Sequence, residues 1–169
     1  MQKSNSNSEL YYKDATELAE MIRRRVVSSR EVMAACLARI ELLNPQVNAI
    51  CTLREAEDLL READAADALL AKGGEVGALH GLPIAIKDLT LTKGLRTTYG
   101  SLIYKDFIPH QDQLFVARIK SAGAIVIGKT NTPEFGAGSH TFNKLFGLTR
   151  NPYNLDKSAG AAAAGRLLH

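Results

Sequence analysis

The stretch Ala122-Gly123-Ala124-Ile125-Val126-Ile127-Gly128 decides the fold class of this chain. An apolar helical pattern over residues 114–119, which Asp112 can cap, precedes it and ends at the first glycine. A run of β-branched residues follows at once, and the apolar run Leu82–Leu89 has the composition of a second buried strand. A helix that ends at a glycine and leads into a buried strand is typical of α/β proteins, so we predict an α/β fold.

The first third of the chain predicts helices. Asp14 can cap a segment whose apolar residues share one stripe, and Ser28 and Glu31 have the spacing of a capping box for the next helix. That second helix is expected to stop before Asn44-Pro45, because the residue before a proline avoids the helical region. A third helix is expected from about Leu53 to Leu70.

Composition and charge exclude several classes of protein. The chain has 169 residues, of which 46% are hydrophobic and 23% charged, as in one ordinary domain or a part of a larger one. A net charge of +3 argues against nucleic acid as a partner, and no apolar run is long enough for a membrane span. Two cysteines and four histidines show neither a disulfide framework nor metal-ligand spacing. The polar N-terminus has no secretory pattern, so the cytoplasm is the expected compartment.

One formal motif match is rejected on physical grounds. Residues 123–130, Gly-Ala-Ile-Val-Ile-Gly-Lys-Thr, satisfy the P-loop pattern for phosphate binding. A P-loop needs a flexible glycine-rich turn between a strand and a helix, whereas these middle residues favour the strand itself. We therefore expect no nucleotide at this segment.

Lys87 is a stronger candidate for a functional residue, because it lies at the end of an apolar strand within Gly81–Asp88. A lysine that loses its hydration at the edge of a core is deprotonated more easily and can then act as a general base. The alternative is a lysine that extends to solvent beside Asp88, and the segment alone leaves both open.

The motifs that surround Lys87 in the sequence favour its interpretation as a general base. Four short motifs follow one another along the chain: Gly81-x-Pro83-x-x-x-Lys87-Asp88, Gly94-x-x-Thr97-Thr98-x-Gly100-Ser101, Ala122-Gly123-Ala124-x-x-x-Gly128-Lys129-Thr130-Asn131-x-Pro133-Glu134-Phe135, and Gly147-x-Thr149-x-Asn151-Pro152. Their order and spacing closely resemble the amidase signature family over about residues 10 to 160. The glycine-rich region from Asn131 to Gly160 lacks periodicity, as functional loops often do.

The resemblance implies a fold and a chemistry. The family fold is a large mixed sheet covered by helices, of which this chain would hold the N-terminal helices and the first strands. Its members hydrolyse carbon–nitrogen amide bonds with a Ser-Ser-Lys triad, an acyl-enzyme intermediate and no metal or organic cofactor. Different members act on tRNA-bound glutamate, fatty amides, aryl amides or small nitrogenous acids, so a small-molecule amide is the expected substrate. Lys87 matches the family's lysine, the general base. Phe135 and Gly136 are expected to border the pocket for the acyl group.

The chain departs from the family pattern after Gly160. The family carries a Gly-Gly-Ser-Ser-Gly-Gly stretch that supplies the bridging serine, and here Ala162 stands at that position within Ala161–Ala164. The second, nucleophilic serine lies further on in the family. Because a triad acts as a unit, this 169-residue chain is expected to be inactive.

Codon arithmetic suggests an origin for the departure. If the alanines of Ala161–Ala164 are written GCA GCA GCG GCG after a codon ending in G, reading one base earlier gives GGC AGC AGC GGC, which encodes Gly-Ser-Ser-Gly. A base lost near codon 160 would therefore explain residues 161–169 as an out-of-frame tail. A natural short paralogue with a selected tail and a deliberately altered gene are the alternatives.

These expectations describe the chain as a single partial amidase domain with three regions and a tail. Residues 1–10 are expected to be disordered, 11–75 helical, and 76–160 the start of the α/β core. An incomplete sheet leaves hydrogen-bonding edges exposed, which predicts self-association. A non-catalytic role, in which such an edge binds a partner or an intact relative, is the alternative function.

Overall fold

A computed structural model describes residues 10–160 of the chain. The helices are α2 (Ala15–Arg23), α3 (Ser29–Val47), α4 (Ala56–Ala71) and α5 (Leu114–Ser121), and short 3-10 turns occur at Leu102–Tyr104 and Glu134–Gly136. The strands are β1 (Ile50–Leu53), β2 (Pro83–Lys87), β3 (Ile125–Thr130), β4 (Phe142–Asn143), β5 (Gly147–Leu148), β6 (Arg150–Asn151) and β7 (Asn154–Ser158). The predicted α/β class is confirmed.

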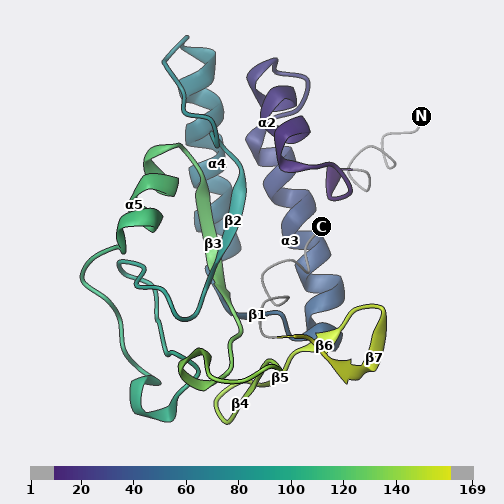
Figure 1. Ribbon diagram of the computed structural model, residues 1–169. Helices are drawn as coiled ribbons and strands as arrows, with labels where there is room; N and C mark the ends of the chain where they lie inside the picture. Colours follow the sequence, from purple (N-terminus) through teal and green to yellow (C-terminus); the bar gives the residue numbers. More distant parts are fainter. Residues whose placement is uncertain (1–9, 161–169) are drawn as a thin grey trace.

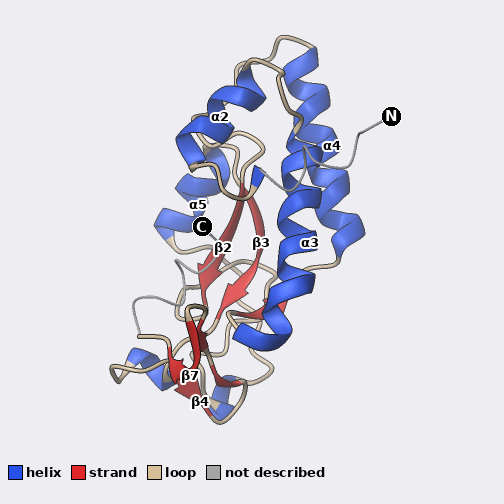
Figure 2. Cartoon of the chain, turned by 90° about the vertical axis from the view of Figure 1, so that its right-hand side faces the viewer, coloured by secondary structure: helices blue, strands red, loops and turns tan. Residues whose placement is uncertain are grey.

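The main sheet is mixed and has three strands, in the order β1-β3-β2. β2 runs parallel to β3, whereas β1 runs antiparallel to it. Helices α3 and α4 lie on one side of β2 and β3 and α5 lies on the other, as Figures 1 and 2 show from two directions. The carboxyl ends of β2 and β3 point toward the end of the molecule where β4 to β7 form two small hairpins (Figure 2).

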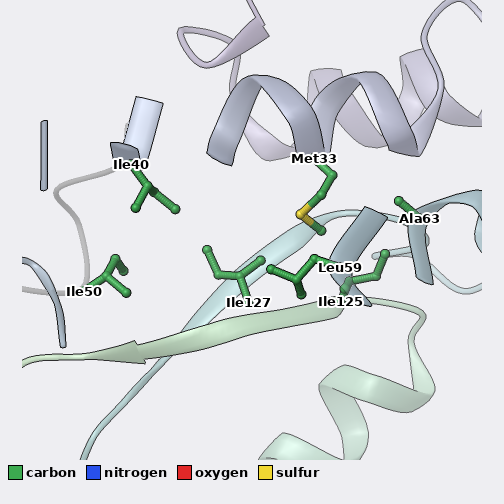
Figure 3. Packing of buried hydrophobic residues seen from close by; sticks show 7 residues of the cluster. All are labelled: Met33, Ile40, Ile50, Leu59, Ala63, Ile125 and Ile127. Carbon is green, nitrogen blue, oxygen red and sulfur yellow. The ribbon is translucent and has the colours of Figure 1, made fainter. Parts of the chain in front are cut away.

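The largest apolar cluster joins α3 and α4 to the sheet. Figure 3 shows Met33 facing Ile127 and Ile125 of β3, with Leu59 beside them. Met33 and Leu59 are fully buried. A smaller cluster on the opposite face contains Ile86, Val116 and Val126. Alternate residues of β3 therefore pack against opposite layers, as a strand between two layers of helices must.

A bulge at Gly128 changes this alternation at the end of β3. Val126 pairs with Ile84, but the next pair along β2 is Ala85 with Gly128, so Ile127 is the extra residue. A Cβ atom on Gly128 would lie 2.2 Å from the Thr52 carbonyl oxygen. Glycine is required here because β1 approaches the bulge too closely for any side chain.

Two predicted helix starts are confirmed. Asp14 caps α2, since its carboxylate accepts a hydrogen bond of 2.8 Å from the Glu17 amide. Ser28 and Glu31 form the reciprocal capping box of α3. The strand expected within the P-loop-like segment is also confirmed, because residues 125–130 form β3.

The predicted end of α3 is wrong. The helix passes Pro45 and ends at Val47, four residues later than expected. A proline this close to the end removes a single backbone hydrogen bond, because it has no amide hydrogen. The Asn44 side chain fixes the turn that follows the helix. Its Oδ1 accepts hydrogen bonds from the amides of Ala49 and Ile50, at 2.9 and 2.8 Å.

Two further expectations need correction. The segment from Leu53 was expected to be helical, but β1 ends there and α4 begins at Ala56. Pairing with β3 overrides the weak helical pattern of that segment. The Asp112 carboxylate does not cap α5, whose N-cap is Gln113. It instead accepts hydrogen bonds from the Lys93 amide and the Lys120 ammonium group.

No helix within residues 10–160 is both long enough and apolar enough to cross a membrane.

Replacing Gly128 with alanine is predicted to destabilise the fold by about 2–3 kcal/mol, because the new methyl group collides with the backbone of β1. Chemical denaturation would measure the change. Gly94→Ala is the control, since Gly94 has open space around it and only its positive φ of 75° opposes a side chain, at a cost of about 1 kcal/mol. Equal losses in the two variants would contradict the packing argument.

Candidate functional site

Lys87 is the last residue of β2 and is half-buried. It pairs with Thr130, the last residue of β3, which in turn pairs with Ile50 of β1. Paired residues of neighbouring strands direct their side chains to the same face of a sheet. Because Ile50 belongs to the cluster with α3 and α4, Lys87 and Thr130 lie on that face, at the carboxyl end of the parallel pair.

Asp88 follows Lys87 and is fully buried. Its carboxylate accepts hydrogen bonds from the Thr98 hydroxyl and from the Thr98 amide, the latter at 3.0 Å. Burial raises the pKa of Asp88, and the hydrogen bonds from Thr98 and the Lys129 charge oppose that shift. Thr98, from the motif Gly94–Ser101, thus holds Asp88 in place next to Lys87.

Backbone hydrogen bonds connect this turn to the glycine-rich segment after β3. The Tyr99 amide donates to the Asp88 carbonyl at 2.9 Å, and the Phe135 amide donates to the Tyr99 carbonyl at 2.7 Å. Gly100 packs equally closely, since a Cβ atom there would lie 3.0 Å from the Thr132 carbonyl oxygen. Three motifs that are far apart in the sequence therefore meet beside Lys87.

The predicted pocket residues Phe135 and Gly136 lie at this end of the sheet. A Cβ atom on Gly136 would lie 2.8 Å from Leu89 Cδ1, two residues after Lys87. Phe135 has a positive φ of 51°, and its half-exposed ring stacks on Tyr99 at a centroid distance of 6.5 Å. Strained backbone of this kind is common at functional sites.

An aromatic cluster surrounds Phe135. Tyr104 meets the Phe135 ring edge-on at 6.2 Å, and Phe107 meets both Tyr99 and Tyr104. The cluster makes a partly exposed apolar surface beside the carboxyl end of β2. Flat or apolar groups would bind such a surface.

A buried amide network fixes the segment that follows β3. The Asn131 side chain accepts a hydrogen bond from Asn143 Nδ2 at 2.7 Å and donates to Thr149 Oγ1 at 3.0 Å. The Thr149 hydroxyl donates to the Asn48 carbonyl at 2.6 Å, which ties the network to the end of α3. Asn131, Asn143 and Thr149 are all buried, so this network is stable only when every member is bonded.

The described chain ends beside this network. The Ala159 amide donates to the Thr149 carbonyl at 2.8 Å, and the Thr141 amide donates to the Ala159 carbonyl at 2.9 Å. Ala159 is buried. Ala162, the position matched to the bridging serine, lies outside the described residues.

Lys129 is a buried charge whose role the sequence did not reveal. The bulge places it opposite Ile86, on the face away from α3, where its side chain is fully buried. Its Nζ donates to the Thr90 carbonyl at 2.5 Å and to the Thr92 hydroxyl at 3.0 Å. Burial lowers the pKa of Lys129 to about 8, while the nearby Asp88 carboxylate opposes the shift. Lys129 thereby holds the turn that follows Lys87.

Neither cysteine has the features of a nucleophile. Cys36 packs against the main core, and burial raises the pKa of its thiol to about 11. The Cys51 thiol donates to the Lys129 carbonyl at 3.5 Å, and burial raises its pKa to about 12. Within residues 10–160, no group of three His, Cys, Asp or Glu side chains could hold a metal ion.

Comparison with known proteins identifies the class to which this arrangement belongs. The family model described as Amidase matches residues 31–166. The chain is therefore a member of the amidase family, the amidase signature enzymes, and the predicted family and fold are confirmed.

Three similar proteins are much longer than this chain. A glutamyl-tRNA(Gln) amidotransferase subunit from Moorella thermoacetica is 44% identical over 157 residues, which cover 93% of this chain and 32% of that protein. A bacterial aryl acylamidase of the amidase signature family is 30% identical with a TM-score of 0.85, covering 92% of this chain and 32% of the other. A fatty acid amide hydrolase is 28% identical with a TM-score of 0.87, covering 98% and 29%. The chain thus spans about a third of the length of the relatives it matches.

Lys129 predicts a pH dependence of stability. The folded chain releases its proton near pH 8 and the unfolded chain near 10.5, so the unfolded state binds more protons between these values. The wild type should therefore gain up to about 3 kcal/mol relative to Lys129→Met as the pH rises through this window. Denaturation at several pH values would measure the difference. The exposed Lys105→Met is the control, and a pH-independent difference for Lys129→Met would contradict the lowered pKa.

Proposed function

We propose that residues 10–160 form the N-terminal third of an enzyme that hydrolyses carbon–nitrogen amide bonds, with Lys87 as its general base. The observation that carries the proposal is the convergence of the separate motifs around Lys87 at the carboxyl end of β2. Membership of the amidase family supports it. The position is also chemically suited, because residues at strand ends can face a site without breaking the sheet.

In the proposed mechanism Lys87 works through a bridging serine of a Ser-Ser-Lys triad. The lysine amine takes the proton of the bridging hydroxyl, which takes the proton of a nucleophilic serine as that serine attacks the amide carbonyl. The amine of the amide leaves with a proton, and water hydrolyses the resulting acyl-enzyme. The triad contains no metal or organic cofactor.

The proposed substrate is a small-molecule amide whose acyl group lies against Phe135 and Gly136. The aromatic surface of Tyr99, Tyr104 and Phe135 supports this placement, because it lies beside the turn that carries Lys87. The similar proteins include a fatty acid amide hydrolase, so an apolar acyl group occurs in the family. The proposed location is the cytoplasm.

A polypeptide of these 169 residues is proposed to be inactive, since Ala162 has no hydroxyl to relay a proton. We attribute residues 161–169 to a base lost near codon 160. The nucleotide sequence of the gene tests this origin directly. A shifted frame that continues into family-like sequence with a second serine would support it, and the lack of such a frame would overturn it.

Restoring the reading frame is predicted to restore hydrolysis of simple amides such as propionamide or benzamide, measured by ammonia release. Lys87→Ala in the restored enzyme should lower kcat at least about 1,000-fold, because one member of a triad is lost. Lys72→Ala, which changes another lysine outside the triad, should keep activity. Full activity of the Lys87→Ala enzyme would refute the general-base role.

A second candidate function is supported by the open side of β2. Within the described residues β2 has a neighbouring strand on one side only. An apolar cavity of about 230 Å³ lies beside it and is lined by Leu18, Val32, Leu82, Pro83 and Ile84, among others. Such an edge could bind an intact relative or a second copy of the chain. Pull-down with an intact amidase, and sedimentation of the chain alone, would test both; a monomer that captures nothing would remove this candidate.

A further inference from the structure

A second cavity, of about 490 Å³, lies at the edge of β3 and contains neither Lys87 nor any residue of the aromatic cluster. It exists because β1 is shorter than β3. β1 ends where Leu53 pairs with Gly128, so the first residues of β3 have no strand on that side. Arg54 takes the place of the missing strand, since its Nη1 donates to the Val126 carbonyl at 2.8 Å.

The lining of this cavity is basic, and its charged residues are Arg54, Glu62, Lys93 and Lys120. The guanidinium group of Arg54 pairs with the Glu62 carboxylate. The Lys120 Nζ lies 2.9 Å from each carboxylate oxygen of Asp112. Within residues 10–160, Lys93 forms no ion pair. Three cations face two carboxylates, so one positive charge at this cavity is unbalanced.

The cations come from three segments and are held in place by the fold. Arg54 follows β1, Lys120 lies in the last turn of α5, and Lys93 belongs to the loop between β2 and α5. The Lys93 amide donates to the Asp112 carboxylate at 2.7 Å, and the next amide, of Gly94, donates to a carbonyl at 3.0 Å. An ammonium group has three N–H donors, so Lys120 keeps one beyond the two that face Asp112.

We propose that this cavity binds a phosphate group, either free or carried by a small polar molecule. Phosphate presents several strong acceptor oxygens in different directions, which suits donors from three segments, whereas a carboxylate presents only two oxygens in one plane. The volume leaves room beyond the phosphate group, and the mostly polar lining favours a polar body such as a sugar. The proposal does not rest on the role of Lys87.

Isothermal titration calorimetry of the 169-residue chain at constant ionic strength tests the site. The probes are inorganic phosphate, ribose 5-phosphate and acetate. Both phosphates should saturate one site, and acetate should bind at least about tenfold more weakly, because it loses one charge-assisted hydrogen bond. Tighter binding of ribose 5-phosphate supports a phosphorylated molecule as the ligand, and tighter binding of inorganic phosphate supports the free ion. No saturable binding of either phosphate, or equally tight binding of acetate, would overturn the proposal.

Three variants locate the binding. Lys93→Gln removes the unpaired cation and should weaken phosphate binding at least about tenfold. The matched control Lys72→Gln makes the same change on an exposed lysine outside the cavity and should bind like the wild type. Glu62→Gln releases Arg54 and should tighten binding about threefold, a gain that loss of folding cannot produce. Unchanged affinity in Lys93→Gln, or weaker binding by Glu62→Gln, would overturn the proposal.

Discussion

The pairing of β2 with β3 is the constraint on which the site depends. The bulge at Gly128 shifts the alternation of β3 just before its end. As a result Thr130 and Lys87 share the face with α3, while Lys129 turns to the opposite face and holds the loop that follows Lys87. Without the bulge, Lys129 would enter the apolar cluster of Met33 and Ile127, where a charge has no partner. The extra residue in β3 therefore places Lys129, which holds the loop, and Lys87, the proposed general base, on opposite faces of the sheet.

Buried polar groups, rather than apolar packing, organise the end of the sheet where Lys87 lies. Asp88 is held by Thr98, and Asn131 is held by Asn143 and Thr149. Each of these groups would destabilise the fold if left unbonded, so together they enforce one arrangement of loops that contain little regular structure.

Several features could be predicted from local sequence because their causes are local. The caps of α2 and α3 depend on residues three positions apart, and the strand nature of residues 125–128 follows from their β-branched side chains. The predictions for Leu53 and Asp112 were wrong because residues elsewhere in the chain decided them. Leu53 pairs with Gly128 of β3, and Lys93 and Lys120 bind the Asp112 carboxylate. The prediction for Pro45 was wrong because a proline in the last turn removes only one backbone hydrogen bond of α3.

The sequence by itself determined the α/β class, the amidase family and the place of Lys87 at the end of a strand, because these depend on residue order and composition. It could not reveal the role of Lys129, which lies in a segment that formally matches a phosphate-binding loop. That role depends on which face of β3 the side chain occupies. A bulge, and the partners Thr90 and Thr92 in another segment, decide that face, and only the tertiary structure contains them.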